Sequence, residues 1–166
     1  MDNEMVALRI LHILAGVLWA GGAVMTVWIV GPVLEASGPD VMKQVGPRLI
    51  KPLIIYVHAT AITTIALGLL LINRTPGRGY DQLFQNGWGW AIGLGLIVSV
   101  VGLSFGSTGS FAMRKAIRIG SQLKGPPAPA VLAEMGMLRK RFKMFTRIGS
   151  VLVVVAVGTM AAARYV

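Results

Sequence analysis

Four long apolar blocks most constrain what this chain can fold into. They cover residues 5–30, 52–72, 88–113 and 145–163, and each is close to the ~20 residues that a helix needs to cross ~30 Å of hydrocarbon. Charged residues make up only 13% of the 166 residues, whereas soluble domains carry about 25%. Because a backbone in lipid must satisfy its own hydrogen bonds, helices are the expected form. The sequence therefore predicts an all-α fold, a four-helix bundle that forms one integral membrane domain over residues 1–166.

The breaks between the blocks predict where the helices end. The Gly-Pro pair at residues 31–32 is expected to stop the first helix, and the Lys-Pro pair at residues 51–52 is expected to open the second. The first block lacks a basic leader and is longer than the apolar core of a signal peptide, so we expect it to stay in the protein.

The positive charges predict an orientation. Twelve of the 16 Lys and Arg residues fall in the connections at residues 31–52 and 113–147, and four fall on the other side. The twelve are Lys43, Arg48, Lys51, Arg114, Lys115, Arg118, Lys124, Arg139, Lys140, Arg141, Lys143 and Arg147, and the four are Arg9, Arg74, Arg78 and Arg164. Cytoplasmic loops carry such an excess, so we expect a protein of the cytoplasmic (inner) membrane with both termini outside. The net charge of +10 is assigned to anionic lipid headgroups on the cytoplasmic side rather than to nucleic acid.

The segment at residues 131–145 mixes apolar and basic residues at helical spacing. It is interpreted either as an amphipathic helix on the inner leaflet, or as a docking face for a partner subunit. A plainer interpretation is a cytoplasmic start to the fourth helix. We expect the chain to form a homo-oligomer or to belong to a larger membrane complex.

A stripe of small residues runs along the third block. Its members are Gly95, Ser99, Gly102, Gly106 and Gly109, which share one face of a helix. Such a face lets a neighbouring helix approach closely, or it leaves room for a flat cofactor between helices.

Several kinds of chemistry are excluded by composition. The chain has no cysteine, so thiolate metal sites and disulfides are absent. Its six acidic residues all lie in ends or connections, and no phosphate-binding or dinucleotide-binding motif occurs. The sequence therefore favours a role in which the chain alone is not an enzyme.

The only two histidines, His12 and His58, both fall inside predicted spans. Ionisable residues inside membranes are candidates for function by default. Three interpretations stay open: ligation of heme or a metal, a neutral imidazole bonded to a backbone carbonyl or hydroxyl, and a proton-handling role. The helical rise separates the two histidines by more than ~10 Å along the membrane normal. Because axial nitrogens on one iron are ~4 Å apart, we do not expect the two to share one iron.

The surroundings of each histidine add candidate ligands. Met160 is expected at the depth of His12 and Met25 near His58, and His/Met pairs occur in heme proteins while thioethers also suit Cu(I). Gly16 and Trp19 share the face of His12, where a flat ring could lie against the glycine.

One turn outward from His12, Arg9 could pair with a propionate or an anionic lipid. The predicted cofactor-binding set is His12, His58, Gly16, Trp19, Arg9, Met160 and Met25, with the two histidines as metal ligands.

Two motifs resemble known membrane families. LHILAGVLWAGG at residues 11–22 and LIKPLIIYVHATAITTIALGLLL at residues 49–71 are similar to small four-helix proteins related to copper resistance protein D. The layout also resembles the four-helix membrane protoporphyrinogen oxidases. The residues that carry the resemblance are His12, Trp19, Gly21, Gly22, Thr64 and Gly68.

The first resemblance implies copper uptake or tolerance at the inner membrane, and the second implies heme b bound by His12. The oxidase family carries a lysine in its third helix, whereas this chain has none between Trp88 and Met113, so we do not expect oxidase activity. Three hypotheses follow: a heme b protein that serves as an electron-transfer or accessory subunit, a copper-handling protein, and a non-catalytic scaffold subunit.

Overall fold

The computed structural model describes residues 3–123 and 125–166, and within them leaves the side chains of residues 39, 43 and 47 undescribed. It is 88% helical and contains no strand in these residues, which confirms the all-α prediction. Four helical segments are long and apolar enough to cross a membrane. The elements in chain order are α1 (Asn3–Met25), the π-helix η1 (Thr26–Val30), α2 (Gly31–Ala36), α3 (Pro39–Arg74), the 3₁₀ turn η2 (Tyr80–Gln82), α4 (Gly87–Gln122) and α5 (Pro129–Ala162).

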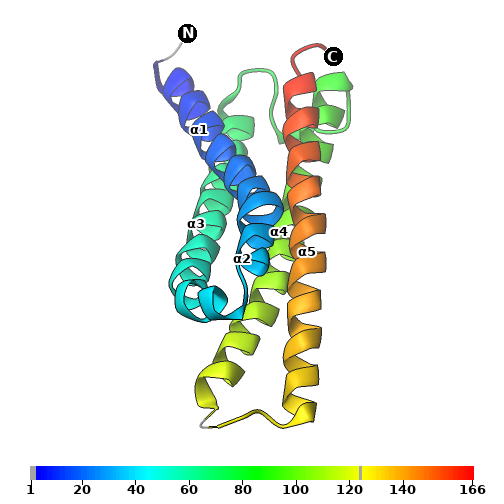
Figure 1. Cartoon of the computed structure of the whole chain (residues 1–166). Helices are drawn as coiled ribbons and strands as arrows, with labels where there is room; N and C mark the ends of the chain where they lie inside the picture. The colour runs from blue at the N-terminus through cyan, green and yellow to red at the C-terminus, as the bar shows by residue number, and fades with distance from the viewer. Residues whose placement is uncertain (1–2, 124) are drawn as a thin grey trace.

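Helix α1 begins, and α5 ends, at the same end of the bundle, which we call the terminal end (Figure 1). The α2–α3 turn and the α4–α5 connection lie toward the opposite end, and the α4–α5 hairpin extends well past the α2–α3 turn (Figure 1). The two hairpins of this bundle therefore differ in length.

The predicted stop at residues 31–32 is wrong, because the helix runs on to Ala36. A proline ring inside a regular α-helix collides with the carbonyl four residues earlier and supplies no N–H. Here the turn before Pro32 widens into the π-helix, and the N–H of Gly31 donates to the carbonyl of Thr26. A π-bulge of this kind lets the chain pass a proline without ending the helix.

The second and fourth helices begin before the apolar blocks, the fourth as the plainer interpretation of residues 131–145 predicted. Helix α3 begins at Pro39 rather than near residue 52, and α5 begins at Pro129 rather than at residue 145. Both helices open with proline in the first turn, where the missing N–H has no helical partner to lose. The segment at residues 131–145 is therefore the first part of α5, in line with the span, and forms no separate helix in the membrane plane (Figure 1).

The helices pack in two pairs. Helix α4 lies along α5, α1 lies along α3, and the contacts between the two pairs are fewer. Trp19 of α1 joins the pairs, because its buried side chain packs with Ala61 of α3 and Val153 of α5. Ala61 is fully buried, so a small residue here is what admits the indole.

The small-residue stripe of α4 faces α5. A Cβ on Gly149 of α5 would lie 2.9 Å from the carbonyl oxygen of Gly102 and 3.1 Å from the nitrogen of Gly106. A Cβ on Gly95 would lie 2.8 Å from Cγ of Met160, and one on Gly109 would lie 2.9 Å from Cγ2 of Thr146. The stripe is therefore a helix-packing face at Gly95, Gly102 and Gly109, where α5 fills the space, whereas nothing lies within 4 Å of the position that a Cβ on Gly106 would take.

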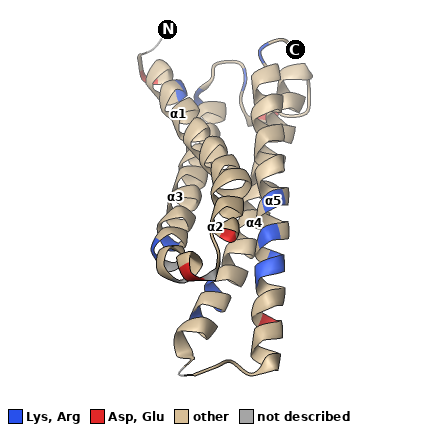
Figure 2. Cartoon of the chain, viewed as in Figure 1, with Lys and Arg blue, Asp and Glu red and all other residues tan. Residues whose placement is uncertain are grey.

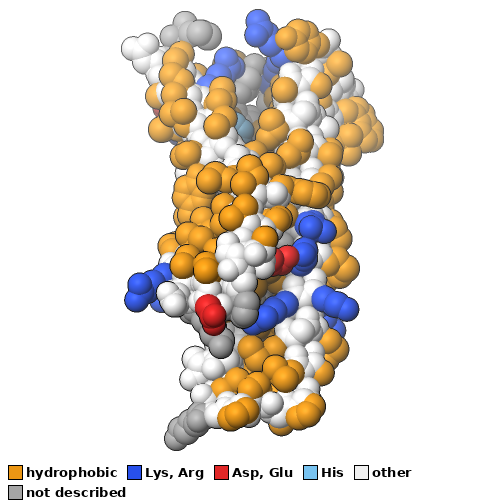
Figure 3. Space-filling model, in the orientation of Figure 1, with side chains coloured by type: hydrophobic (Ala, Val, Ile, Leu, Met, Phe, Trp, Pro, Cys, Tyr) orange, Lys and Arg blue, Asp and Glu red, His pale blue; other side chains and the backbone are white. Residues whose placement is uncertain are grey.

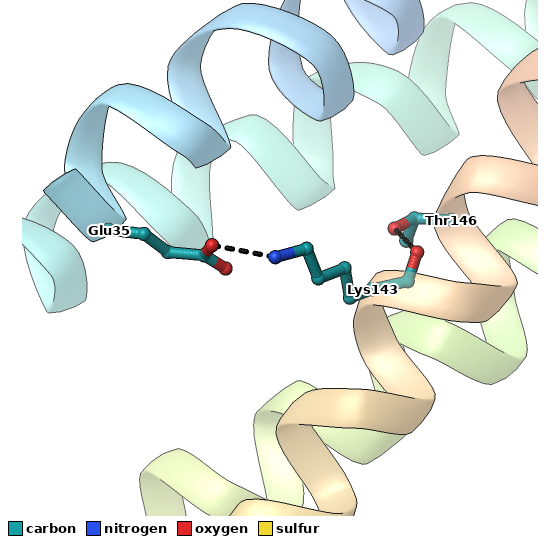
Figure 4. Close-up of polar contacts among 3 residues, drawn as sticks. All are labelled: Glu35, Lys143 and Thr146. Atoms are coloured by element: carbon teal, nitrogen blue, oxygen red, sulfur yellow. Dashed lines mark hydrogen bonds and ion pairs between the residues drawn. The ribbon is translucent and has the colours of Figure 1, made fainter.

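Polar contacts fasten the first helical segment to α5 near the α2–α3 turn. The indole N–H of Trp28 donates to Oγ of Ser150 at 3.0 Å, and the guanidinium of Arg147 lies 5.4 Å from the centre of the Trp28 ring. One turn further, Nζ of Lys143 lies 2.7 Å from a carboxylate oxygen of Glu35 (Figure 4). Lys and Arg gather at this level of the molecule and beyond it (Figure 2).

Candidate functional site at His12

His12 of α1 bridges to α3 through one ring nitrogen. Its Nδ1 lies 2.9 Å from the backbone carbonyl oxygen of Thr64. A carbonyl oxygen only accepts hydrogen bonds, so Nδ1 must carry the proton and donate it. In the neutral imidazole the lone pair is then on Nε2. This contact fixes both the tautomer and the orientation of the ring.

A glycine of α3 makes room for the ring. A Cβ on Gly68 would lie 3.0 Å from Cε1 of His12, which is closer than most side chains tolerate. Four residues further along α1, the Cβ position of Gly16 lies 3.6 Å from Cγ2 of Thr64, an ordinary contact. Helices α1 and α3 therefore meet with Gly16 and His12 against Thr64 and Gly68.

The second ring nitrogen of His12, Nε2, differs from Nδ1 in its hydrogen bonding. Within the described part of the chain, no hydrogen bond reaches Nε2 of His12, and the ring is half-buried. A half-buried imidazole with a donor bond on Nδ1 and a free lone pair on Nε2 has the arrangement that metal-ligating histidines use.

His58 of α3 has both nitrogens engaged. Its Nδ1 lies 2.7 Å from the carbonyl oxygen of Ile54, one turn earlier on the same helix, so Nδ1 donates. Its Nε2 lies 3.1 Å from Oγ of Ser107 on α4, and the neutral ring accepts from that hydroxyl. His58 thus links α3 to α4 and keeps no lone pair for a ligand.

The two histidines lie at different heights. His12 contacts the Thr64–Gly68 turn of α3, while His58 lies between Ile54 and Ser107. Helix α3 rises by about 15 Å between these two levels. The structure therefore does not bring His12 and His58 to one site.

The two candidate methionines contact other parts of the bundle. Met25 is 57% exposed and lines a shallow apolar groove of about 350 Å³ together with Leu53 and Tyr56, whereas His58 turns to Ser107 of α4. Met160 is half-buried, and its side chain lies against Gly95 at the α4–α5 contact.

The two remaining candidates are Trp19 and Arg9. Trp19 is 4% exposed at the centre of the bundle, where it fills space between the two helical pairs. Arg9 is exposed near the terminal end. At the same end, Nη1 of Arg74 lies 2.6 Å from a carboxylate oxygen of Glu4 and joins α3 to the start of α1.

Other acidic and histidine side chains do not add a metal site. In residues 3–123 and 125–166, no group of three or more His, Asp or Glu side chains is placed to hold a metal ion. Among the described residues, His12 therefore offers a single nitrogen donor.

Several contacts were not anticipated from the sequence. The hydroxyl of Tyr56 donates to the carbonyl of Leu18 at 3.0 Å, and the Tyr56 ring covers the position that a Cβ on Gly22 would take. The sequence also does not predict Ser107 as the partner of His58. A polar residue on an apolar stretch of the third span was the available signal, but nothing in the sequence pairs it with His58.

Comparison with protein families, with curated proteins and with solved structures gives no significant match to this chain. The geometry of His12 and the arrangement of charge along the bundle are therefore the features that point to a function.

Proposed function

We propose that this chain is a heme b-binding membrane protein in which His12 would hold the iron through Nε2. The observation that carries the proposal is the bond from Nδ1 of His12 to the Thr64 carbonyl, which leaves the lone pair on Nε2. A second-sphere bond of this kind orients a ligating imidazole and raises its basicity.

The residues around His12 fit a heme iron that this side chain would hold, because they keep its ring in place. Gly68 has no side chain, so the ring of His12 has room against α3. The backbone carbonyl of Thr64 accepts from this ring, whereas the hydroxyl of Thr64 donates to the carbonyl of Thr60 at 2.7 Å. Arg9, one turn toward the terminal end, is the cation for a propionate. When bound, heme supplies one-electron redox chemistry, which suits an electron-transfer or accessory subunit.

The proposed location is the cytoplasmic membrane, with both termini outside. Support comes from the excess of Lys and Arg in the two connections away from the terminal end, where basic side chains gather (Figure 2). Anionic headgroups of the inner leaflet are the corresponding lipid partners.

An absorption spectrum with metal analysis tests the proposal. The chain is produced in cells supplied with heme precursors, purified in mild detergent, and measured for a Soret band, for heme b by pyridine haemochrome, and for iron and copper. We expect a Soret band and heme b iron near one per chain. Copper without a Soret band would instead favour the copper-handling hypothesis, and a colourless, metal-free protein would favour the scaffold hypothesis; either result contradicts heme binding.

A further inference from the structure

The α4–α5 hairpin carries an apolar surface outside the membrane level. Two contacts mark where the hydrocarbon ends on the side away from the terminal end. They are the Lys143–Glu35 ion pair (Figure 4) and Arg147 against Trp28, and charged groups and tryptophan gather at headgroups. Beyond Lys143, α5 continues back to Pro129 and α4 continues to Gln122. The end of this hairpin therefore projects past the headgroups.

Large apolar side chains are exposed on the projecting part. Leu132 is 55% exposed and Met137 is 59% exposed. Helix α5 rises by about 16 Å between Lys143 and Leu132, so Leu132 lies far beyond the hydrocarbon. Apolar side chains are visible below the charged belt in Figure 3. Large apolar side chains that are exposed to water on one helix are candidates for an interaction site.

These side chains share one face of α5, together with two small residues. We call this set, Leu132, Ala133, Gly136 and Met137, the tip patch. All four are exposed, and nothing lies within 4 Å of the position that a Cβ on Gly136 would take. The α4-facing side of the helix is different, since Leu138 is buried there. The tip patch is thus open, and the glycine allows a second backbone to approach closely.

The tip patch is bordered by positive charge. Arg139, Lys140 and Arg141 follow it after the buried Leu138 and are exposed. Glu134 is the acidic residue of this part of α5, and its carboxylate lies 2.8 Å from Nζ of Lys115. The net field at the border is therefore strongly positive, and carboxylates on a partner would complement it.

We propose that the tip patch docks an amphipathic acidic helix of a partner protein, with its apolar face on Leu132, Gly136 and Met137 and its carboxylates toward Arg139–Arg141. A lipid surface does not fit, because α5 continues in line with the span and carries the tip patch from about 9 Å (Met137) to about 16 Å (Leu132) beyond Lys143. A second copy of the chain does not fit either, because its own tip carries the same positive border and like charges repel.

Site-specific photo-crosslinking in intact cells tests the docking. A photo-reactive amino acid is placed at Leu132, at Met137 and, as a lipid-facing control, at Val154, which is 52% exposed. We expect one discrete adduct with another protein from both tip positions and none from Val154. Mass spectrometry should locate the cross-link in a segment of net negative charge with apolar residues at helical spacing. Adducts with a second copy, with lipid alone, or with a segment that is not acidic would overturn the proposal, as would the absence of any adduct.

A variant that lacks the bordering charges is the second part of the docking test. Replacing Arg139, Lys140 and Arg141 together by glutamine should lower the adduct yield at least fivefold, because carboxylates then lose their partners. Glutamine is preferred to glutamate because it leaves nine of the twelve orienting cations and adds no opposing charge. The matched control replaces both arginines by lysine, keeps every charge, and should retain the adduct. An unchanged yield in the glutamine variant would contradict the charge complementarity, whatever the heme content of the chain.

Discussion

Both histidines of this bundle donate a hydrogen bond through Nδ1, and they differ in whether the lone pair of Nε2 has a partner. Both donate Nδ1–H to a backbone carbonyl, but His58 uses the carbonyl of Ile54 on its own helix, whereas His12 uses that of Thr64 on the neighbouring helix. The ring of His58 therefore projects to α4 and meets Ser107, while the second nitrogen of His12 meets no hydrogen-bond partner in the described residues. The choice of carbonyl decides which histidine can act as a ligand.

Displacing the ring of His12 should have the largest effect. Gly68→Leu puts a branched side chain where Cε1 of His12 lies only 3.0 Å from the new Cβ, so the ring must leave the Thr64 carbonyl. We expect heme b per purified chain to fall at least tenfold, as measured by pyridine haemochrome.

The matched control for this variant is Gly21→Leu. It adds the same side chain on α1 at an exposed position where nothing lies within 4 Å of the Cβ, and it should keep the heme content of the parent chain. Full heme occupancy in Gly68→Leu would show that heme binding does not need the contact between the His12 ring and α3.

Removing His58 should affect stability and spare heme binding. His58→Ala loses the bond between α3 and α4, and we expect a loss of about 1–2 kcal/mol in the free energy of unfolding, in line with hydrogen bonds between membrane helices. The measurement is denaturation in mixed micelles followed by circular dichroism.

A double-mutant cycle with Ser107→Ala sharpens this prediction. The coupling between the two positions should be about 0.6 kcal/mol, because Nε2 of His58 and Oγ of Ser107 bond each other. Zero coupling, or a loss of heme in His58→Ala, would contradict the assignment of His58 as a structural residue.

The smallest effect is expected at the side chain of Thr64. Thr64→Val keeps the backbone carbonyl that accepts from His12 and removes only the hydroxyl bond to the Thr60 carbonyl within α3. We expect heme content to be unchanged and stability to change by less than about 1 kcal/mol. A clear fall in heme content would mean that the threonine hydroxyl, and not the backbone, holds the site.

The sequence predicted the number and class of the helices but not their ends. Hydropathy identifies the segment that is apolar enough to lie in lipid. A helix extends beyond that segment for as long as its backbone hydrogen bonds continue. Pro32 was expected to break the first helix, yet the π-helix at Thr26–Val30 absorbs it. Pro39 and Pro129 start helices outside the apolar windows, where hydropathy gives no signal.

The candidate site was predicted in part. His12 was identified because a histidine is costly in hydrocarbon, and Gly16 was placed on its face by helical spacing. Thr64 and Gly68 came only from the resemblance, and the sequence did not predict that they contact His12, since the rotation of α1 against α3 depends on packing. The same reason explains why Met25 and Met160 were expected beside the histidines, although their side chains have other neighbours.

The most direct test of the central proposal compares heme b per chain in the parent protein, His12→Asn and His58→Asn, purified in parallel. Asparagine at position 12 can still donate an amide N–H to the Thr64 carbonyl but offers no imidazole lone pair. We predict that His12→Asn folds with parent-like thermal stability and lacks the Soret band, while His58→Asn keeps it. A Soret band that survives in His12→Asn, or that disappears only in His58→Asn, would contradict the account.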